Sequence, residues 1–241
     1  MTYLEPFFGS GAVFFNKNRS RIETINDLDG NVVNLFKVIR EHPKDLARQI
    51  EFTPWSRDEH QQSYEITGDP LEDARRFLVR MWQGQKSKVT KSGWRNNIIP
   101  DDTGLSRWGK LSECIFESSK RLLNAGNCLV QIENKNAIEL IQNYKRDYVF
   151  IYCDPPYVLS TRAGRMYNHE MKDKEHIDLL NVLLQHPGPV MISGYESDIY
   201  NDMLQGWKQD KKATLCEIRQ ERVEVIWMNY EAIFEQISLI G

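Results

Sequence analysis

The chain has no long apolar run, no charged-then-apolar leader pattern and few cysteines. No stretch of its 241 residues approaches the roughly 18 apolar residues of a membrane span, and we expect a protein of the reducing cytoplasm. The four cysteines form no Cys-x-x-Cys pair, so the sequence indicates neither a disulfide framework nor a metal site. Internal repeats and low-complexity tracts are also missing, which excludes solenoid and fibrous classes.

Charge is unevenly distributed along the chain. The net charge of −3 argues against a polyanionic partner, but residues 75–121 hold eleven Lys/Arg and four Asp/Glu. This span therefore carries +7 and the rest of the chain −10, an asymmetry typical of a local phosphate-binding face. For Arg75, Arg76 and Arg80, a solvated helix face is an equally good interpretation. For the polar, basic stretch 86–95, a DNA-contacting loop is favoured. The candidate DNA-binding residues are Lys86, Lys88, Lys91, Trp94, Arg95 and Arg107.

Alternating apolar segments predict an α/β fold with a doubly wound, mostly parallel sheet covered by helices on both faces. In the middle of the chain the pattern turns helical, with two amphipathic helices. We therefore predict an α/β domain at residues 1–53 plus 126–241 and a helical insertion at 54–125. The strands are expected at 2–5, 21–29, 129–132, 148–153, 190–193 and 223–227, and the insertion helices at 71–82 and 108–123.

The strand at 148–153 ends in Asp154-Pro155-Pro156-Tyr157. Each proline fixes φ and removes a backbone donor, which leaves nearby carbonyls free to accept hydrogen bonds. The carboxylate is a further acceptor, and the phenol ring offers a flat stacking surface. A planar base with an exocyclic amino group matches this set. The alternative is a strand that stops at a Pro-Pro turn with a surface tyrosine.

A glycine turn follows the first predicted strand. Glu5 ends that strand, and Gly9 and Gly11 allow a sharp bend and a close approach to a ligand before an apolar helix begins. The free N–H groups of such a helix favour an anionic group. The full Gly-x-Gly-x-x-Gly dinucleotide pattern is absent, because position 14 is Phe14.

The second strand ends in acids. Asp27 lies about 20 residues beyond the glycine turn, where doubly wound folds place the acid that binds ribose hydroxyls. A helix N-cap is the alternative role, and Asp29 suits that role better than Asp27.

Together, residues 5–11 and 154–157 resemble the Dam-like class of S-adenosylmethionine-dependent N(6)-adenine DNA methyltransferases. Segments 130–134 and 190–195 resemble later strands of that family, and 222–230 resembles its late hairpin, in the same order. The resemblance implies a methyltransferase-type sheet and S-adenosylmethionine as cofactor. It also implies methylation of the 6-amino group of an adenine flipped out of double-stranded DNA. The insertion would be the target-recognition domain.

The resemblance also implies residue roles. Asp154 and the Pro155 carbonyl would accept the two amino hydrogens, Pro156 would keep the bend rigid, and Tyr157 would stack on the base. Glu5 would hold the methionine amino group, and Phe7 either contacts the cofactor adenine or fills the core. The implied cofactor-binding residues are Glu5, Phe7, Gly9, Gly11, Asp27 and Asp154.

Two departures from the family pattern leave other functions open. The usual segment with a lysine and glycines ahead of the first strand is not seen, and Asn136 stands where an acid often follows the strand ending near Glu133. The chain could thus be a cofactor-impaired relative that only binds DNA. A nucleotide-dependent oxidoreductase is disfavoured, since Asp-Pro-Pro-Tyr has no role there. We expect no obligatory protein partner, and a compact solitary enzyme suits a bacterial or phage genome, as part of restriction, self-protection or regulation.

Overall fold

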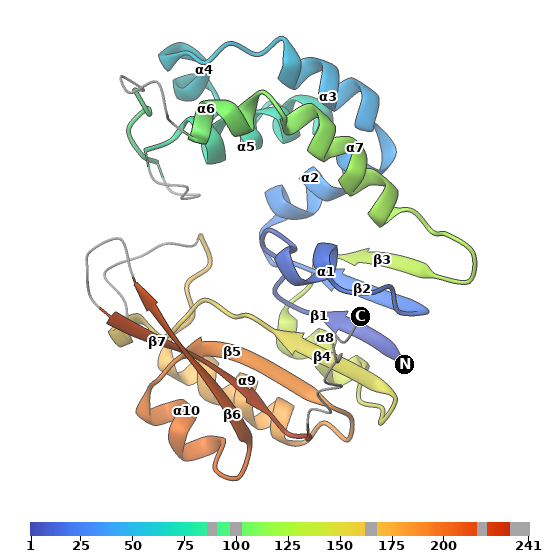
Figure 1. Cartoon of the computed structure of the whole chain (residues 1–241), viewed down its shortest axis with the longest axis vertical. Helices are drawn as coiled ribbons and strands as arrows, with labels where there is room; N and C mark the ends of the chain where they lie inside the picture. The colour runs from blue at the N-terminus through green and yellow to red at the C-terminus, as the bar shows by residue number, and fades with distance from the viewer. Residues whose placement is uncertain (86–90, 97–102, 162–167, 216–220, 232–241) are drawn as a thin grey trace, which may run out of the picture.

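A seven-stranded sheet forms the centre of the molecule (Figure 1). The computed structural model describes residues 1–85, 91–96, 103–161, 168–215 and 221–231. The strand order is β3-β2-β1-β4-β5-β7-β6, in which β7 runs antiparallel to both of its neighbours and the other pairs are parallel. The doubly wound, mostly parallel sheet predicted from the sequence is therefore confirmed. The strands are β1 (Thr2–Glu5), β2 (Ile22–Asn26), β3 (Leu129–Glu133), β4 (Val149–Cys153), β5 (Val190–Tyr195), β6 (Lys208–Leu215) and β7 (Glu221–Met228).

Successive side chains of each strand point to opposite faces, and two hydrophobic clusters result. In β1, Tyr3 belongs to the first cluster and Leu4 to the second. The first cluster includes residues of α1 (Ala12–Asn16), α2 (Gly30–Glu41) and α3 (Pro43–Glu51). Helices α8 (Ala137–Asn143), α9 (Asp173–Leu184) and α10 (Asp198–Met203) contribute to the second. Both faces of the sheet are thus covered.

The middle of the chain forms a group of helices beside α2 (Figure 1). They are α4 (Arg57–Gln62), α5 (Pro70–Gln83), α6 (Thr103–Trp108) and α7 (Leu111–Leu122). The helix predicted at 71–82 is confirmed, whereas the single helix predicted at 108–123 is wrong in its first turn. Two helices occupy that region, since Gly109 is a poor helix former and separates α6 from α7.

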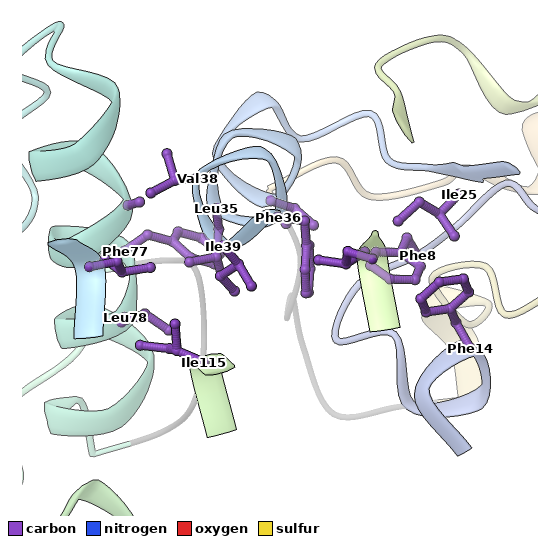
Figure 2. Close-up of a cluster of buried hydrophobic side chains, with 14 of the residues drawn as sticks. Phe8, Phe14, Ile25, Leu35, Phe36, Val38, Ile39, Phe77, Leu78 and Ile115 are labelled. Atoms are coloured by element: carbon purple, nitrogen blue, oxygen red, sulfur yellow. The ribbon is translucent and has the colours of Figure 1, made fainter. Parts of the chain in front are cut away.

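The inserted helices share the first hydrophobic cluster with the sheet. Figure 2 shows Phe77 of α5 and Ile115 of α7 on one side of α2, with Phe8 and Phe14 on the other side. Leu35 of α2 belongs to the same cluster. Apolar burial of this kind contributes roughly 25 cal/mol per Å². The helices are therefore packed against the α/β part, and the boundaries at 54 and 125 stay a prediction.

A buried ion network ties the end of α7 to β2. Arg121 donates to both oxygens of Glu23 at 2.6 and 2.9 Å, and Lys17 also pairs with this carboxylate. Burial alone would raise the pKa of Glu23, but the bonds from Arg121 and Lys17 bring it below its ordinary value. Arg19 adds hydrogen bonds to the carbonyls of Lys120 and Leu123. The chain thus returns from the insertion to the sheet at a defined place.

The strand order reverses between β1 and β4. From β1 the chain builds outward through β2 to β3, and from β4 it builds the other way through β5. At such a switch point the loops after two neighbouring parallel strands diverge, and ligands bind outside their carboxyl ends. The late strand predicted at 223–227 is confirmed within β7, whereas its partner β6 was not predicted. Among the described residues no helix combines the length and hydrophobicity that a bilayer crossing requires.

Candidate active site

The two motifs singled out in the sequence meet at the switch point. Leu4 of β1 pairs with Ile151 of β4 in parallel register. Glu5 ends β1 and Asp154 follows β4, so both carboxylates emerge at the same edge of the sheet. Their charges interact, since Asp154 contributes to the raised pKa of Glu5. The tertiary structure thus brings together residues that stand far apart in the sequence.

Glu5 is a buried acid. It is 2% exposed, and the Tyr3 hydroxyl donates a 2.6 Å hydrogen bond to its Oε2. Burial raises the pKa of Glu5 to about 8; the Tyr3 bond opposes this shift, and the negative charge of Asp154 adds to it. A buried carboxylate of this kind gains most from a cationic partner, because a cation offsets the loss of hydration.

The turn after β1 depends on its glycines. Gly9 has φ +50° and Gly11 has φ +69°. A Cβ at Gly11 would lie 2.5 Å from the Phe8 ring, while a Cβ at Gly9 would meet nothing within 4 Å. Gly11 is therefore required by packing and backbone conformation. Gly9 leaves open space beside the backbone, where a ligand can approach closely.

Asp27 holds this turn in place. Its Oδ2 accepts from the Gly9 N–H and its Oδ1 from the Asp29 N–H, both at 2.8 Å. Burial raises the pKa of Asp27 above its ordinary value, and these two bonds offset only part of the rise. The helix cap is Asp29, which accepts from the Asn31 N–H at 2.9 Å, as the sequence predicted. Asp27 thus bonds the glycine turn and does not cap the helix. It also lines a shallow hollow together with residues that include Phe8, Phe36, Ile132 and Glu133.

The two phenylalanines of the turn differ in environment. Phe8 is 5% exposed and packs edge-to-face on Phe36, with ring centroids 4.7 Å apart. Phe7 is partly buried and packs against the second hydrophobic cluster. Core packing therefore accounts for Phe8. A role for Phe7 in cofactor binding stays a prediction.

Asp154 is open to solvent but has protein groups close around it. Its side chain is exposed by area, yet desolvation by the surrounding protein raises its pKa. The Ser193 hydroxyl donates to Asp154 Oδ1 at 2.8 Å, and a hydrogen bond with Tyr157 is the second interaction that opposes the shift.

Two tyrosine rings lie on one side of Asp154, because Tyr157 bonds to it and packs on Tyr195. Tyr157 packs edge-to-face on Tyr195, with centroids 4.6 Å apart, and burial together with Asp154 raises the pKa of Tyr157. Pro155 is buried, and no donor from the described part of the chain reaches its carbonyl. Asp154 and Tyr157 are therefore neighbours, and the role of the Pro155 carbonyl as a second acceptor stays a prediction.

Two site residues were missed by the sequence reasoning. Asn26, which is buried, donates to the carbonyls of Pro6 and Lys135 and accepts from the Lys135 N–H, so it joins the glycine turn to the loop after β3. Ser193 contacts Asp154 from β5. The only sequence signal was a polar residue near the end of an apolar strand, which does not say where the side chain points.

The DNA-binding candidates belong to the helical insertion. Along the sequence they are far from both motifs that meet at the switch point. Trp94 pairs with Gly84 in an antiparallel bridge, and the Arg95 N–H donates to the Gln83 carbonyl at 2.7 Å. Lys91 is exposed, as is Arg107 in the last turn of α6. Lys86 and Lys88 lie outside the described residues. The base of a hairpin thus joins 83–85 to 93–95, and the DNA-contacting loop favoured at 86–95 stays a prediction.

Comparisons with known proteins identify a family. The family model described as D12 class N6 adenine-specific DNA methyltransferase matches residues 1–94 and 110–222. No curated protein sequence matches the chain. Among solved structures, the rRNA methyltransferase aviRa from Streptomyces viridochromogenes is similar over 94% of this chain and 76% of its own, with 11% identity and a TM-score of 0.34. So loose a likeness carries no argument, and the family match stands without it.

Proposed function

Since the chain belongs to the D12 class N6 adenine-specific DNA methyltransferase family, we propose that it methylates an adenine flipped out of double-stranded DNA and held beside Asp154 and Tyr157. The enzyme class, DNA as substrate and S-adenosylmethionine as methyl donor follow from the family. The sequence prediction of this family is confirmed. The observation that carries the proposal is the convergence of Glu5 and Asp154 at the switch point of the sheet.

The side chains at the switch point fit this cofactor. It carries an ammonium and a sulfonium, and the site offers buried acid Glu5 with Asp154 beside it. The space where a Cβ would lie at Gly9 is empty, and Asp27 borders the hollow at the ends of β2 and β3. In the proposed arrangement Glu5 holds the amino group and Asp27 the ribose hydroxyls. Phe7, Gly9 and Gly11 shape the turn around the ligand.

The adenine would be held by the Asp-Pro-Pro-Tyr segment. Asp154 accepts one amino hydrogen and the Pro155 carbonyl the other, while the Tyr157 ring stacks on the base. Pro156 keeps the bend rigid, because its φ is fixed. The amino nitrogen then presents its lone pair along a single direction. Two reactants held this way avoid an entropic cost of up to roughly 7–11 kcal/mol.

The methyl donor supplies an electrophilic methyl group on a positively charged sulfur. The nitrogen–methyl bond would form as the methyl–sulfur bond breaks, which would leave a neutral thioether, and the nitrogen would then lose one proton to solvent. The Asp154 carboxylate would stabilise the positive charge that the nitrogen gains in between. Ser193 supports this role, since its hydrogen bond favours the ionised form of Asp154. Asp154 therefore acts as an orienting acceptor, and no covalent intermediate with the chain is needed.

The target amino group lies inside a duplex, so the base has to leave the stack before it can reach Asp154. The proposed partner surface is the helical insertion at 54–125, acting as target-recognition domain. Its candidate contacts are Lys86, Lys88, Lys91, Trp94, Arg95 and Arg107. Support comes from the excess of positive charge in this part of the chain and from the exposure of Lys91 and Arg107.

Transfer of labelled methyl from S-adenosylmethionine to unmodified duplex DNA, followed by mapping of modified adenines, tests the proposal. Asp154→Ala should lower the rate by about 100-fold or more, the usual loss when a group that stabilises transition-state charge is removed. Asp178→Ala removes an exposed acid on α9 and serves as the matched control. An Asp154→Ala chain as fast as the parent would refute the proposed site.

A further inference from the structure

Three cations lie on aromatic rings at the base of the insertion hairpin. The Arg80 guanidinium lies 5.4 Å from the centroid of Phe77 and 6.0 Å from that of Tyr64. Lys91 Nζ is 5.8 Å from the Tyr64 centroid. Nearby in the fold, the Arg57 guanidinium lies 5.0 Å from the Trp94 ring. Rings in this geometry hold cations without neutralising them.

Tyr64 joins the elements that carry these cations. Its hydroxyl accepts from the Ser92 N–H at 3.0 Å, so the returning strand of the hairpin is tied to the end of α4. The same hydroxyl lies 3.2 Å from Nε2 of His60, which is buried. The Tyr64 ring therefore has a fixed position, with Arg80 from α5 and Lys91 from the hairpin both near it.

Arg80 is a buried cation without a counter-ion. It is 8% exposed, and its Nε is buried with no hydrogen-bond partner. No ion pair or hydrogen bond joins its guanidinium to another residue in the described ranges. Its neighbours on α5 differ, because Arg75 pairs with Glu59 and Glu72, and Arg76 pairs with Glu72. Burial lowers the pKa of Arg80, as expected for a cation that lacks a partner.

The carboxylates whose charge acts on Arg80 are already engaged. Asp73 accepts from the N–H groups of Thr67 and Gly68 and from the Thr67 hydroxyl. Asp29 accepts from Asn31 at the start of α2 and from the Asn168 amide at 2.9 Å. Both carboxylates act on Arg80 through space and form no ion pair with it. An anion from outside the chain that bonds directly to the guanidinium would therefore stabilise this region further.

We propose that Arg80, with Lys91 on the same Tyr64 ring and Arg57 on the Trp94 ring, is a binding site for backbone phosphates of the DNA substrate; this rests on the proposed function. A guanidinium matches phosphate geometry through paired N–H donors. A polyanion fits better than a small ion, because the cations come from α4, α5 and the hairpin and are held by three rings, those of Tyr64, Phe77 and Trp94.

Salt dependence of duplex binding tests the proposal. Labelled duplex DNA is titrated with the full chain by fluorescence anisotropy at several salt concentrations. Arg80→Gln should bind about ten-fold more weakly at low salt. Its slope of log affinity against log salt should be shallower by about 0.9, the value for one phosphate contact. Arg76→Gln, which alters a paired arginine on the same helix, should keep the parent slope, and Arg80→Lys should keep most of it.

Each other outcome has a distinct meaning. An Arg80→Gln chain with the parent slope overturns the phosphate site, even if thermal unfolding shows that it is less stable. Protection of the parent by inorganic phosphate, lost in Arg80→Gln while the duplex slopes agree, would mark a small-anion site and overturn the DNA assignment. A parent chain that binds no duplex at any salt overturns the proposed function, and the phosphate site with it.

Discussion

Replacing Glu5 by glutamine should change the pH dependence of folding in a defined direction. Glutamine has nearly the same shape, cannot ionise, and keeps an oxygen that accepts the Tyr3 hydroxyl. In the parent, the pKa of Glu5 rises from 4.5 to about 8 on folding. A carboxyl whose pKa is raised by folding favours the native state at low pH. That advantage is lost as the pH rises from 4.5 toward 8.

The size of this effect follows from the raised pKa. Each pKa unit corresponds to 1.36 kcal/mol. Because the unfolded chain ionises Glu5 while the folded chain keeps it mostly protonated, the raised pKa lowers stability by about 3 kcal/mol at pH 7 and by under about 1 kcal/mol at pH 5. The glutamine variant avoids this cost but places an amide N–H₂ in a buried site, which costs a constant amount at every pH. The stability difference between variant and parent should therefore shift in favour of the variant by about 2.5 kcal/mol between pH 5 and pH 7.

Urea unfolding at pH 5, 6 and 7 measures this difference directly. Calorimetry with S-adenosylmethionine at pH 6 and 7 measures the functional counterpart. If the cofactor ammonium needs ionised Glu5, the affinity of the parent should rise about ten-fold between these pH values, as the ionised fraction does. The glutamine variant should bind weakly at both.

A stability difference that stays constant from pH 5 to pH 7 would refute the reasoning about Glu5. It would mean that the carboxyl either keeps an ordinary pKa or stays hydrated in the folded chain. Equal affinity of parent and variant for the cofactor would instead leave the folding argument intact and contradict the proposed contact with the amino group.

Three further predictions follow from packing and hydrogen bonding. Ser193→Ala removes a bond that lowers the pKa of Asp154, so the acid limb of the methylation pH profile should move to higher pH, and Ser193→Thr should restore it. Gly11→Ala should destabilise the fold by about 1–3 kcal/mol in thermal unfolding, because φ is +69° and the added methyl meets a ring. Arg121→Met should cost about 3–5 kcal/mol by leaving buried Glu23 short of a partner, and Arg121→Lys should recover part of that loss.

Local chemistry allowed the strands and both motifs to be recognised from the sequence. Apolar runs bounded by Gly, Pro and acids mark strands because a buried strand excludes polar side chains, and Asp29 was identified as a cap because its short carboxylate suits that position. Segment 108–110 was misjudged and β6 was missed. The first contains a single glycine within an amphipathic pattern, and the second is a lysine-rich edge strand with little apolar alternation.

The sequence by itself determined which side chains end the strands, and thus that Glu5, Asp27 and Asp154 are available at one edge of a parallel sheet. Only the tertiary structure decided that β1 lies beside β4 and that Ser193 reaches Asp154. It also distinguished Arg80, which lacks a counter-ion, from the paired arginines of the same helix. The reason is physical: strand pairing, burial and ion pairing join residues far apart in the chain, and no local pattern records which partners meet.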